Sequence, residues 1–147
     1  MNNSIPIKGV IFDLDNTLLD FMKMKEVAVK SAIKGMIEAG LEIDEVESFK
    51  DIISIYEEFG WENQKVFDVF LDKSIGYVDN KFLAAGIVAY RRSREANLLA
   101  YPNVNRTLVN LTKLGIKLAV VSDAPSREAW MRTVSYTHLT LPTICSV

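Results

Sequence analysis

The sequence predicts an α/β protein whose parallel sheet is interrupted by an inserted block of helices. Two short apolar runs, residues 10–12 and 117–122, are rich in β-branched residues and have the length of buried strands. The second run follows an amphipathic helix and Gly115, which is the order of elements in proteins with a parallel sheet whose two faces are covered. Roughly eighty residues with helical spacing separate the two runs. We therefore expect adjacent parallel strands at residues 8–13 and 117–122.

The intervening helices are predicted from apolar residues that recur at helical spacing between residues 21 and 98. Gly40 and Gly60 follow the first two of these stretches and are expected to end them. A further helix precedes the second strand, after Pro102. The apolar positions of the inserted helices are Val29, Ile33, Met36 and Ile37, then Ile52, Ile53, Tyr56 and Phe59, then Val66, Phe67, Phe70 and Leu71, and finally Leu83, Ile87 and Tyr90.

These patterns divide the chain into three parts. Residues 1–20 and 99–133 form a partial α/β core, and residues 21–98 form an all-helical cap. The tail, residues 134–147, contains no Lys, Arg, Asp or Glu and has no helical pattern. A strand at 137–141 is one interpretation, but we expect the tail to be non-native and foreign to the fold. Two strands are fewer than the about five or six of a usual sheet, so the sheet is predicted to be incomplete.

Composition excludes several kinds of site. The net charge of −2 gives no indication of a nucleic-acid partner, and no apolar stretch reaches the about 20 residues of a membrane helix. The start of the chain has no apolar signal-peptide segment, so we expect a cytoplasmic protein without a membrane partner. Cys145 and His138 are the sole residues of their types and lie near the end. The main body therefore has no disulfides, Cys/His zinc sites or His-containing triads.

Two carboxylates directly follow the first predicted strand. Asp13 and Asp15 are two residues apart, so an extended chain would direct both to the same side. Two acids at the end of a strand repel each other, and a bound Mg²⁺ would relieve that repulsion because it prefers oxygen ligands. Solvated acids that cap the next helix are the alternative. Ser122 ends the second strand, so its hydroxyl is expected beside Asp13 and Thr17 if the strands are parallel neighbours; it could otherwise cap its own turn.

These residues resemble the motifs of the haloacid dehalogenase (HAD) superfamily. VIFDLDNTLLD at 10–20 is similar to its first motif and LAVVSD at 118–123 to its second. The inserted helices resemble its cap, and YPNV at 101–104 resembles the return from cap to core. The resemblance implies a HAD-like (Rossmann-like) parallel sheet core with a helical cap. AGIVAY at 85–90 is similar, within that superfamily, to archaeal-type glyceraldehyde 3-phosphate phosphatases.

The resemblance also implies a role for each motif residue. Asp13 would be the nucleophile that forms an aspartyl-phosphate, and Asp15 the general acid and then the general base. Thr17, Ser122 and Asp123 would hold the phosphoryl oxygens. Mg²⁺ would bind the carboxylate of Asp13 and the backbone carbonyl of Asp15. The implied function is a Mg²⁺-dependent phosphatase for a small phosphorylated metabolite of sugar phosphate type, and a homodimer is expected.

Two further functions stay open: a non-catalytic α/β interaction module and a 2-haloacid dehalogenase. Asp15 favours the phosphatase, because an alkoxide needs a proton to leave and a halide does not. The lysine of the family's third motif and the acidic pair of its fourth have no match after Ser122. The charged residues that follow, among them Arg132, lie too close to the second strand for those roles. We therefore expect a C-terminally truncated chain with weak or no activity.

One basic cluster falls outside these motifs. Arg91, Arg92 and Arg94 lie together on the last predicted cap helix. A solvated or ion-paired helix face is the simpler interpretation of such a cluster. The alternative is a group of cap side chains that touches an anionic substrate.

Overall fold

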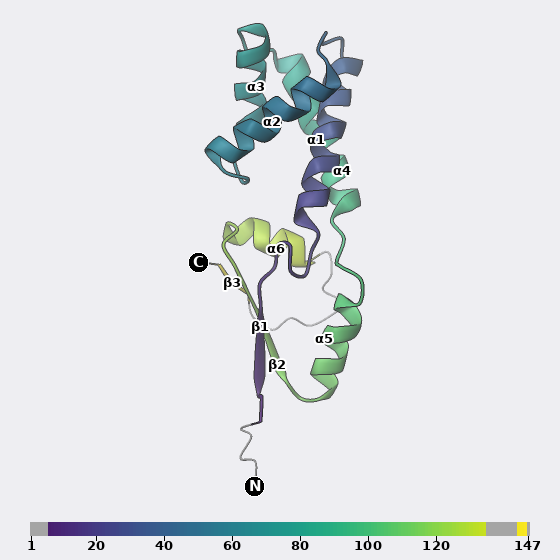
Figure 1. The fold of residues 1–147 in the computed structure, drawn as a ribbon, viewed down its shortest axis with the longest axis vertical. Coiled ribbons are helices and arrows are strands. Elements are labelled where there is room, and N and C mark those ends of the chain that lie inside the picture. The colour runs from purple at the N-terminus through teal and green to yellow at the C-terminus, as the bar shows by residue number, and fades with distance from the viewer. Residues whose placement is uncertain (1–5, 135–143, 147) are drawn as a thin grey trace. The chain divides into compact units, whose positions relative to one another are not determined.

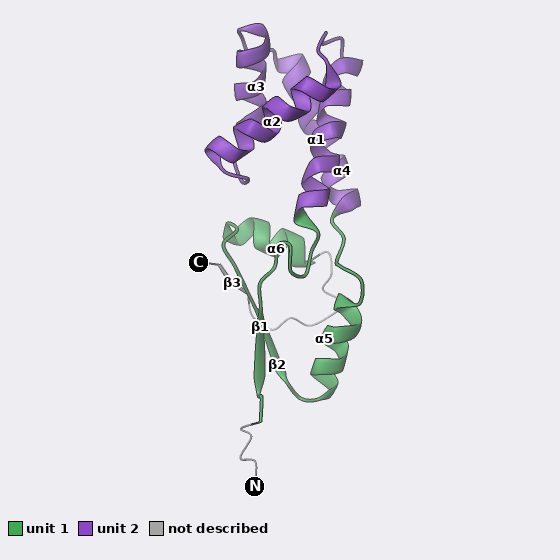
Figure 2. Cartoon of the chain, viewed as in Figure 1, with its two compact units in different colours: residues 1–21, 98–147 green, residues 22–97 purple. Residues whose placement is uncertain are grey.

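A computed structural model describes residues 6–134 and 144–146 of the chain (Figure 1). It divides into two compact units, shown in different colours in Figure 2. Residues 1–21 together with 98–147 form one, here called the core unit, and residues 22–97 form the other, here called the helical unit. The boundaries predicted from the sequence lie at residues 20/21 and 98/99, and the two units of the structure meet at 21/22 and 97/98.

The core unit contains a three-stranded parallel sheet in the order β1-β2-β3. Strand β1 is Gly9–Phe12, β2 is Lys117–Ser122 and β3 is Ile144–Ser146. Gly9 lies opposite Lys117 and Phe12 opposite Val120, which confirms the prediction of adjacent parallel strands. Strand β3 pairs with the end of β2 and was not expected. The alternative strand at 137–141 lies outside the described residues.

Two helices accompany this sheet, α5 at Val104–Lys113 and α6 at Ser126–Val134. Helix α5 ends just before Gly115, whose φ of +74° is a left-handed conformation that glycine adopts without strain. The buried apolar side chains of the core unit come from the loop after β1, from β2 and from α6. They are Leu14, Leu18, Leu19, Val120, Ala124 and Ala129.

One face of the sheet is less covered than the sequence predicted. Ile11 on β1 is 70% exposed and Val121 on β2 is 36% exposed, whereas Leu118 and Val120 are buried. Covering helices on both faces were expected. On β1, Val10 and Phe12 are half-buried, and Ile11 is the exposed residue. The error arose because a run of three apolar residues does not show which of them faces the packed side of the sheet.

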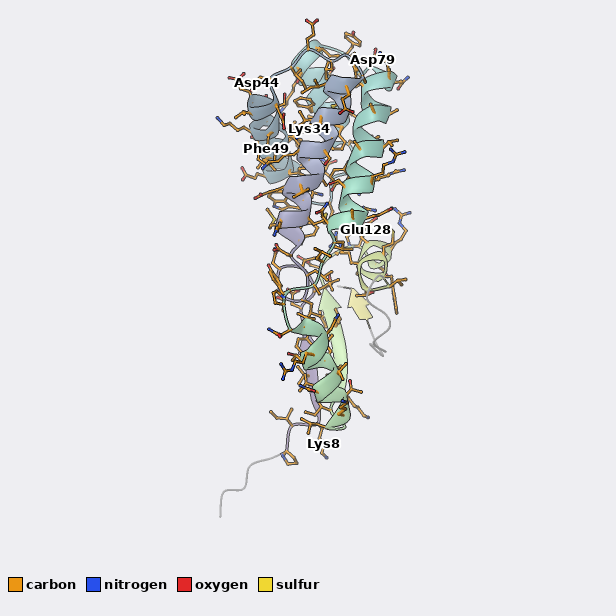
Figure 3. All side chains as sticks on the ribbon, turned by 90° about the vertical axis from the view of Figure 1, so that its right-hand side faces the viewer. Lys8, Lys34, Asp44, Phe49, Asp79 and Glu128 are labelled. Carbon is orange, nitrogen blue, oxygen red and sulfur yellow. The ribbon has the colours of Figure 1, made fainter. Side chains whose placement is uncertain are left out.

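The helical unit consists of α1 at Phe21–Glu38, α2 at Glu45–Phe59, α3 at Val66–Ile75 and α4 at Asn80–Asn97. Between residues 22 and 97 the structure has no strand, as predicted. Asp44 caps α2, because its carboxylate accepts the amides of Val46 and Glu47 at 2.9 and 2.8 Å. Asp79 does the same for α4, and Figure 3 shows both side chains near one end of the unit. None of the described helices is long and apolar enough to cross a bilayer.

Helices α1 and α4 approach each other closely at Gly35 on α1. A Cβ atom on Gly35 would lie 2.8 Å from the Cβ of Ala89 and 3.0 Å from the carbonyl oxygen of Ala85. Gly35 therefore has no space for a side chain, whereas a Cβ on Gly86 of α4 would meet the flexible side chain of Met36. The buried apolar core of the helical unit consists of Val29, Ala32, Ile33, Met36, Leu41, Ile52, Ile55, Tyr56, Val66, Phe67, Phe70 and Leu71.

The substitution Gly35→Ala is expected to lower the free energy of unfolding by about 1–3 kcal/mol, because the new methyl group must push α1 away from α4. This loss should exceed the about 1 kcal/mol that alanine gains over glycine in a helix. Urea denaturation followed by circular dichroism measures it. Lys34→Ala introduces the same residue at an exposed neighbouring position and should change stability little. Stability equal to or above that of the original chain would contradict the close approach.

Candidate active site

The loop after β1 is held by hydrogen bonds to one carbonyl. The carbonyl oxygen of Leu14 accepts the amides of Thr17, Leu18 and Leu19 at 3.4, 2.9 and 3.1 Å. Asn16 takes a φ of +57°, which lets the chain turn back so that its amide donates to Leu19 at 2.8 Å. Leu14, Leu18 and Leu19 are buried, whereas Asn16 and Thr17 are exposed. The apolar residues anchor the loop and leave its polar residues near the surface.

The end of this loop pairs with the segment that returns from the helical residues. The amide of Tyr101 donates to the Leu18 carbonyl at 3.0 Å, and the amide of Asp20 donates to the Leu99 carbonyl at 3.1 Å. Leu19 and Ala100 form an antiparallel bridge between them. The chain therefore leaves the core unit after residues 18–20 and returns to it at residues 99–101. Because these two segments pair, they fix the position of the end of the loop that lies away from β1.

Asp13 and Thr17 are brought together by this turn. The Thr17 hydroxyl donates to Asp13 Oδ2 at 2.7 Å, and both residues are exposed. Asp13 directly follows the last residue of β1, so its carboxylate stands at the carboxyl end of the sheet, where α/β proteins bind ligands. An exposed carboxylate beside a hydroxyl donor is an arrangement that a phosphoryl group can approach.

Asp15 has a partner that the sequence did not reveal. Its carboxylate forms an ion pair with the guanidinium of Arg132 on α6, and the two side chains are only 16% and 7% exposed. The Arg132 guanidinium carbon also lies 4.6 Å from the centre of the Phe21 ring. Both groups in the ion pair are thus largely removed from water, in a contact between residues more than a hundred positions apart.

Arg132 lies too close in sequence to the second strand to supply the third or fourth motif of the family, and no other role was predicted for it. One signal could have identified it: Arg132 follows Ala129 by three positions, a spacing that places both on one face of a helix. The structure buries that face, including Ala129, Arg132 and the charged residue Glu128. Charged residues on a buried face need partners, and Arg132 has Asp15.

Ser122 and Asp123 occupy the neighbouring strand end. Ser122 is buried, and its hydroxyl oxygen accepts the Ala124 amide at 3.1 Å, which is the turn-capping contact of the alternative interpretation. The register places Ser122 two residues beyond Val120 and Asp13 one residue beyond Phe12, so both lie at the same edge of the sheet. Asp123 is exposed.

The oxygen donors of this edge fit a weakly held magnesium ion. Asp13 offers an exposed carboxylate, while the Asp15 carboxylate is engaged by Arg132, so Asp15 would contribute its backbone carbonyl. Mg²⁺ needs few protein ligands when substrate phosphate and water complete its octahedron. Among the described residues no three His, Cys, Asp or Glu side chains gather into a metal cage.

The substitution Arg132→Met is expected to lower the free energy of unfolding by about 3 kcal/mol, because it leaves the largely buried Asp15 carboxylate without its guanidinium partner. Chemical denaturation measures the loss. Arg106→Met on α5 is the matched control, since Arg106 is exposed, and it should change stability by less than about 0.5 kcal/mol. The double variant Asp15→Asn/Arg132→Met should recover part of the loss. Equal losses in the two arginine variants would refute the importance of the ion pair.

Comparisons with known proteins identify relatives of this chain. The chain is 35% identical over 128 residues to the glyceraldehyde 3-phosphate phosphatase of Methanocaldococcus jannaschii, covering 87% of this chain and 56% of that protein. It is 36% identical over 130 residues to the protein of the same name from Methanopyrus kandleri, with the same two coverages. The chain thus spans about half the length of the curated relatives it matches.

Solved structures share the fold at lower identity. A HAD family hydrolase from Deinococcus radiodurans superposes with a TM-score of 0.57 at 21% identity, over 96% of this chain and 58% of that one. A HAD-superfamily hydrolase from Geobacter sulfurreducens gives the same TM-score at 18% identity, over 95% and 62%. Residues 7–140 match the family model of haloacid dehalogenase-like hydrolases. The chain belongs to the haloacid dehalogenase-like hydrolase family.

Proposed function

We propose that this chain carries the nucleophile of a Mg²⁺-dependent phosphatase that hydrolyses a small phosphomonoester of sugar phosphate type. The observation that carries the proposal is the exposed Asp13 carboxylate at the carboxyl end of β1, with the Thr17 hydroxyl 2.7 Å away. Relatives support the substrate class: the archaeal ones are named glyceraldehyde 3-phosphate phosphatase, and one from Nitrosospira multiformis is named phosphoglycolate phosphatase.

The reaction would proceed through two displacements at phosphorus. In the first, an Asp13 carboxylate oxygen attacks the phosphorus and forms an aspartyl-phosphate, while the bond to the leaving alkoxide breaks and Asp15 donates a proton to that alkoxide. In the second, Asp15 takes a proton from water, whose oxygen attacks the phosphorus and releases phosphate from Asp13. A carboxylate suits this work because it is both a nucleophile and a stable leaving group.

The other site residues would position the phosphoryl group. Thr17 would turn its hydroxyl from Asp13 toward a phosphoryl oxygen, and the Ser122 hydroxyl and the amide of Asp123 would meet the others. Asp13 and the Asp15 carbonyl would hold magnesium, whose positive charge offsets the repulsion between carboxylate and phosphate. A structurally similar hydrolase from Bacillus subtilis was solved with bound magnesium, which supports this cofactor.

The ion pair with Arg132 adds a requirement to this mechanism. A carboxylate held by a guanidinium is favoured in its charged form, so Asp15 would have to exchange that contact before it could act as an acid.

The helical unit would correspond to the family's cap. A homodimer and a cytoplasmic location stay predictions from the sequence.

The two alternative functions are less well supported. A 2-haloacid dehalogenase would release a halide, which needs no proton and gives Asp15 no task. The relatives named as phosphatases favour a phosphoryl substrate. A non-catalytic interaction module would not need the contact between Thr17 and Asp13, and measured turnover would exclude it.

The chain of residues 1–147 is expected to show little or no phosphatase activity and to bind Mg²⁺ weakly. The site would offer Mg²⁺ one side-chain carboxylate, from Asp13, and one backbone carbonyl, from Asp15. Water would have to occupy most of the other positions of the octahedron. Hydrolysis of p-nitrophenyl phosphate and calorimetric Mg²⁺ titration measure both properties. Turnover as fast as that of a full-length relative would contradict this prediction, because it would show that groups in residues 134–147 complete the site.

A chimera tests the nucleophile directly. Residues 7–132 joined to the remaining length of the Methanocaldococcus jannaschii relative should hydrolyse p-nitrophenyl phosphate. In that chimera, Asp13→Asn should lower kcat by about 10⁴-fold or more, because an amide is a poor nucleophile, and Asp15→Asn by about 10²–10⁴-fold. Asp72→Asn removes one exposed carboxylate from the helical unit and should leave the rate unchanged. A near-normal rate in the Asp13 variant would refute the covalent mechanism.

A further inference from the structure

The helical unit contains a polar pocket that the proposed chemistry at the core unit does not use. The cavity has a volume of about 80 Å³, which exceeds the about 30 Å³ that one water molecule occupies in the liquid. Its walls come from α1, α2 and α4 and from the segment that leads into α3. The polar and charged residues that line it are Lys25, Glu62, Asn63, Gln64, Arg91 and Arg94.

Lys25 is the most buried of these charged residues. It is 5% exposed, and its ammonium donates to the Trp61 carbonyl at 2.6 Å. The same nitrogen lies 4.1 Å from the centre of the Tyr56 ring and 5.5 Å from that of Tyr90. Lysine is almost never buried to this degree without compensating contacts. These contacts hold a positive charge at a defined point of the pocket wall.

The balance of charge in the pocket is positive. Lys25, Arg91 and Arg94 contribute three positive charges and Glu62 contributes one negative charge, which leaves a net charge of +2. Tyr56 adds no negative charge, because burial raises the pKa of its phenol well above the ordinary value. A negatively charged group that entered the pocket would therefore meet an excess of cationic donors.

We propose that this pocket binds a small oxyanion, a carboxylate or a phosphate group. A guanidinium presents a planar pair of N–H donors that matches two oxygens of such a group, and an ammonium adds a compact charge. The anion could be a second acidic group of a substrate or a separate small molecule. The proposal does not depend on the phosphatase function, since every lining residue belongs to the helical unit.

The structure thereby separates the three arginines of the basic cluster. Arg91 and Arg94 line the pocket, and Arg92 does not. Arg92 is exposed on the same helix. It fits the solvated helix face that the sequence favoured, whereas its two neighbours fit the anion-contacting alternative. Arg92 is consequently a matched control with the same loss of charge.

Isothermal titration calorimetry of the full chain with inorganic phosphate, malonate and phosphoglycolate tests the proposal. Arg91→Gln/Arg94→Gln should weaken binding of at least one anion by about tenfold or more, since it removes hydrogen bonds between charged groups. Arg92→Gln should bind all three anions with the affinity of the original chain. Any anion binding at the core unit is retained in this control variant. If phosphoglycolate alone is affected, the pocket holds a second group of a substrate; if phosphate or malonate is affected, it takes a separate anion.

Equal affinities of the double variant and Arg92→Gln for all three anions would overturn the proposal, provided circular dichroism shows both to be folded. Should the double variant fail to fold, Arg91→Gln carries the same test, because Arg91 is exposed and its loss leaves the core of the unit intact. Loss of activity in the Asp13→Asn chimera with unchanged anion binding would separate this site from the one in the core unit.

Discussion

Phe12 lies opposite Val120 in a parallel pair of strands, although more than a hundred residues separate them. This register brings the end of β1, with Asp13, to the same sheet edge as the end of β2, with Ser122. A shift of one residue would turn the side chains of a strand to the opposite face. The buried residues Leu118 and Val120 oppose such a shift, because it would expose them and bury Val121 instead. The geometry of the candidate active site therefore depends on apolar packing beneath it.

The ion pair between Asp15 and Arg132 adds an unfavourable desolvation free energy to that arrangement. Removing two charges from water is unfavourable unless their contact and other hydrogen bonds compensate. The pair links the loop after β1 to α6, two segments that each border the sheet edge. In the proposed mechanism Asp15 would exchange protons, so the contact that links the loop to α6 would also limit that exchange.

The helical unit is stabilised mainly by apolar packing. Its glycine contacts let α1 and α4 approach closely, and its apolar core needs no polar partners. The exception is the pocket with Lys25, where a buried ammonium is held by a carbonyl and two aromatic rings. Three cationic side chains line this pocket, Lys25, Arg91 and Arg94, which is the physical reason to look for an anionic ligand there.

The sequence by itself determined the features that depend on local chemistry. The two strands and the helices that end before Gly40 and Gly60 are each set by residues within a few positions of one another, where spacing and propensity are informative. Tertiary structure alone decided the rest: the Arg132 partner of Asp15, the position of Lys25 beside Arg91 and Arg94, the exposure of Ile11 and the pairing of β3. Each of these joins segments far apart in the chain or depends on which strand face is packed. A periodic pattern marks a buried face, but it does not name the partner across it.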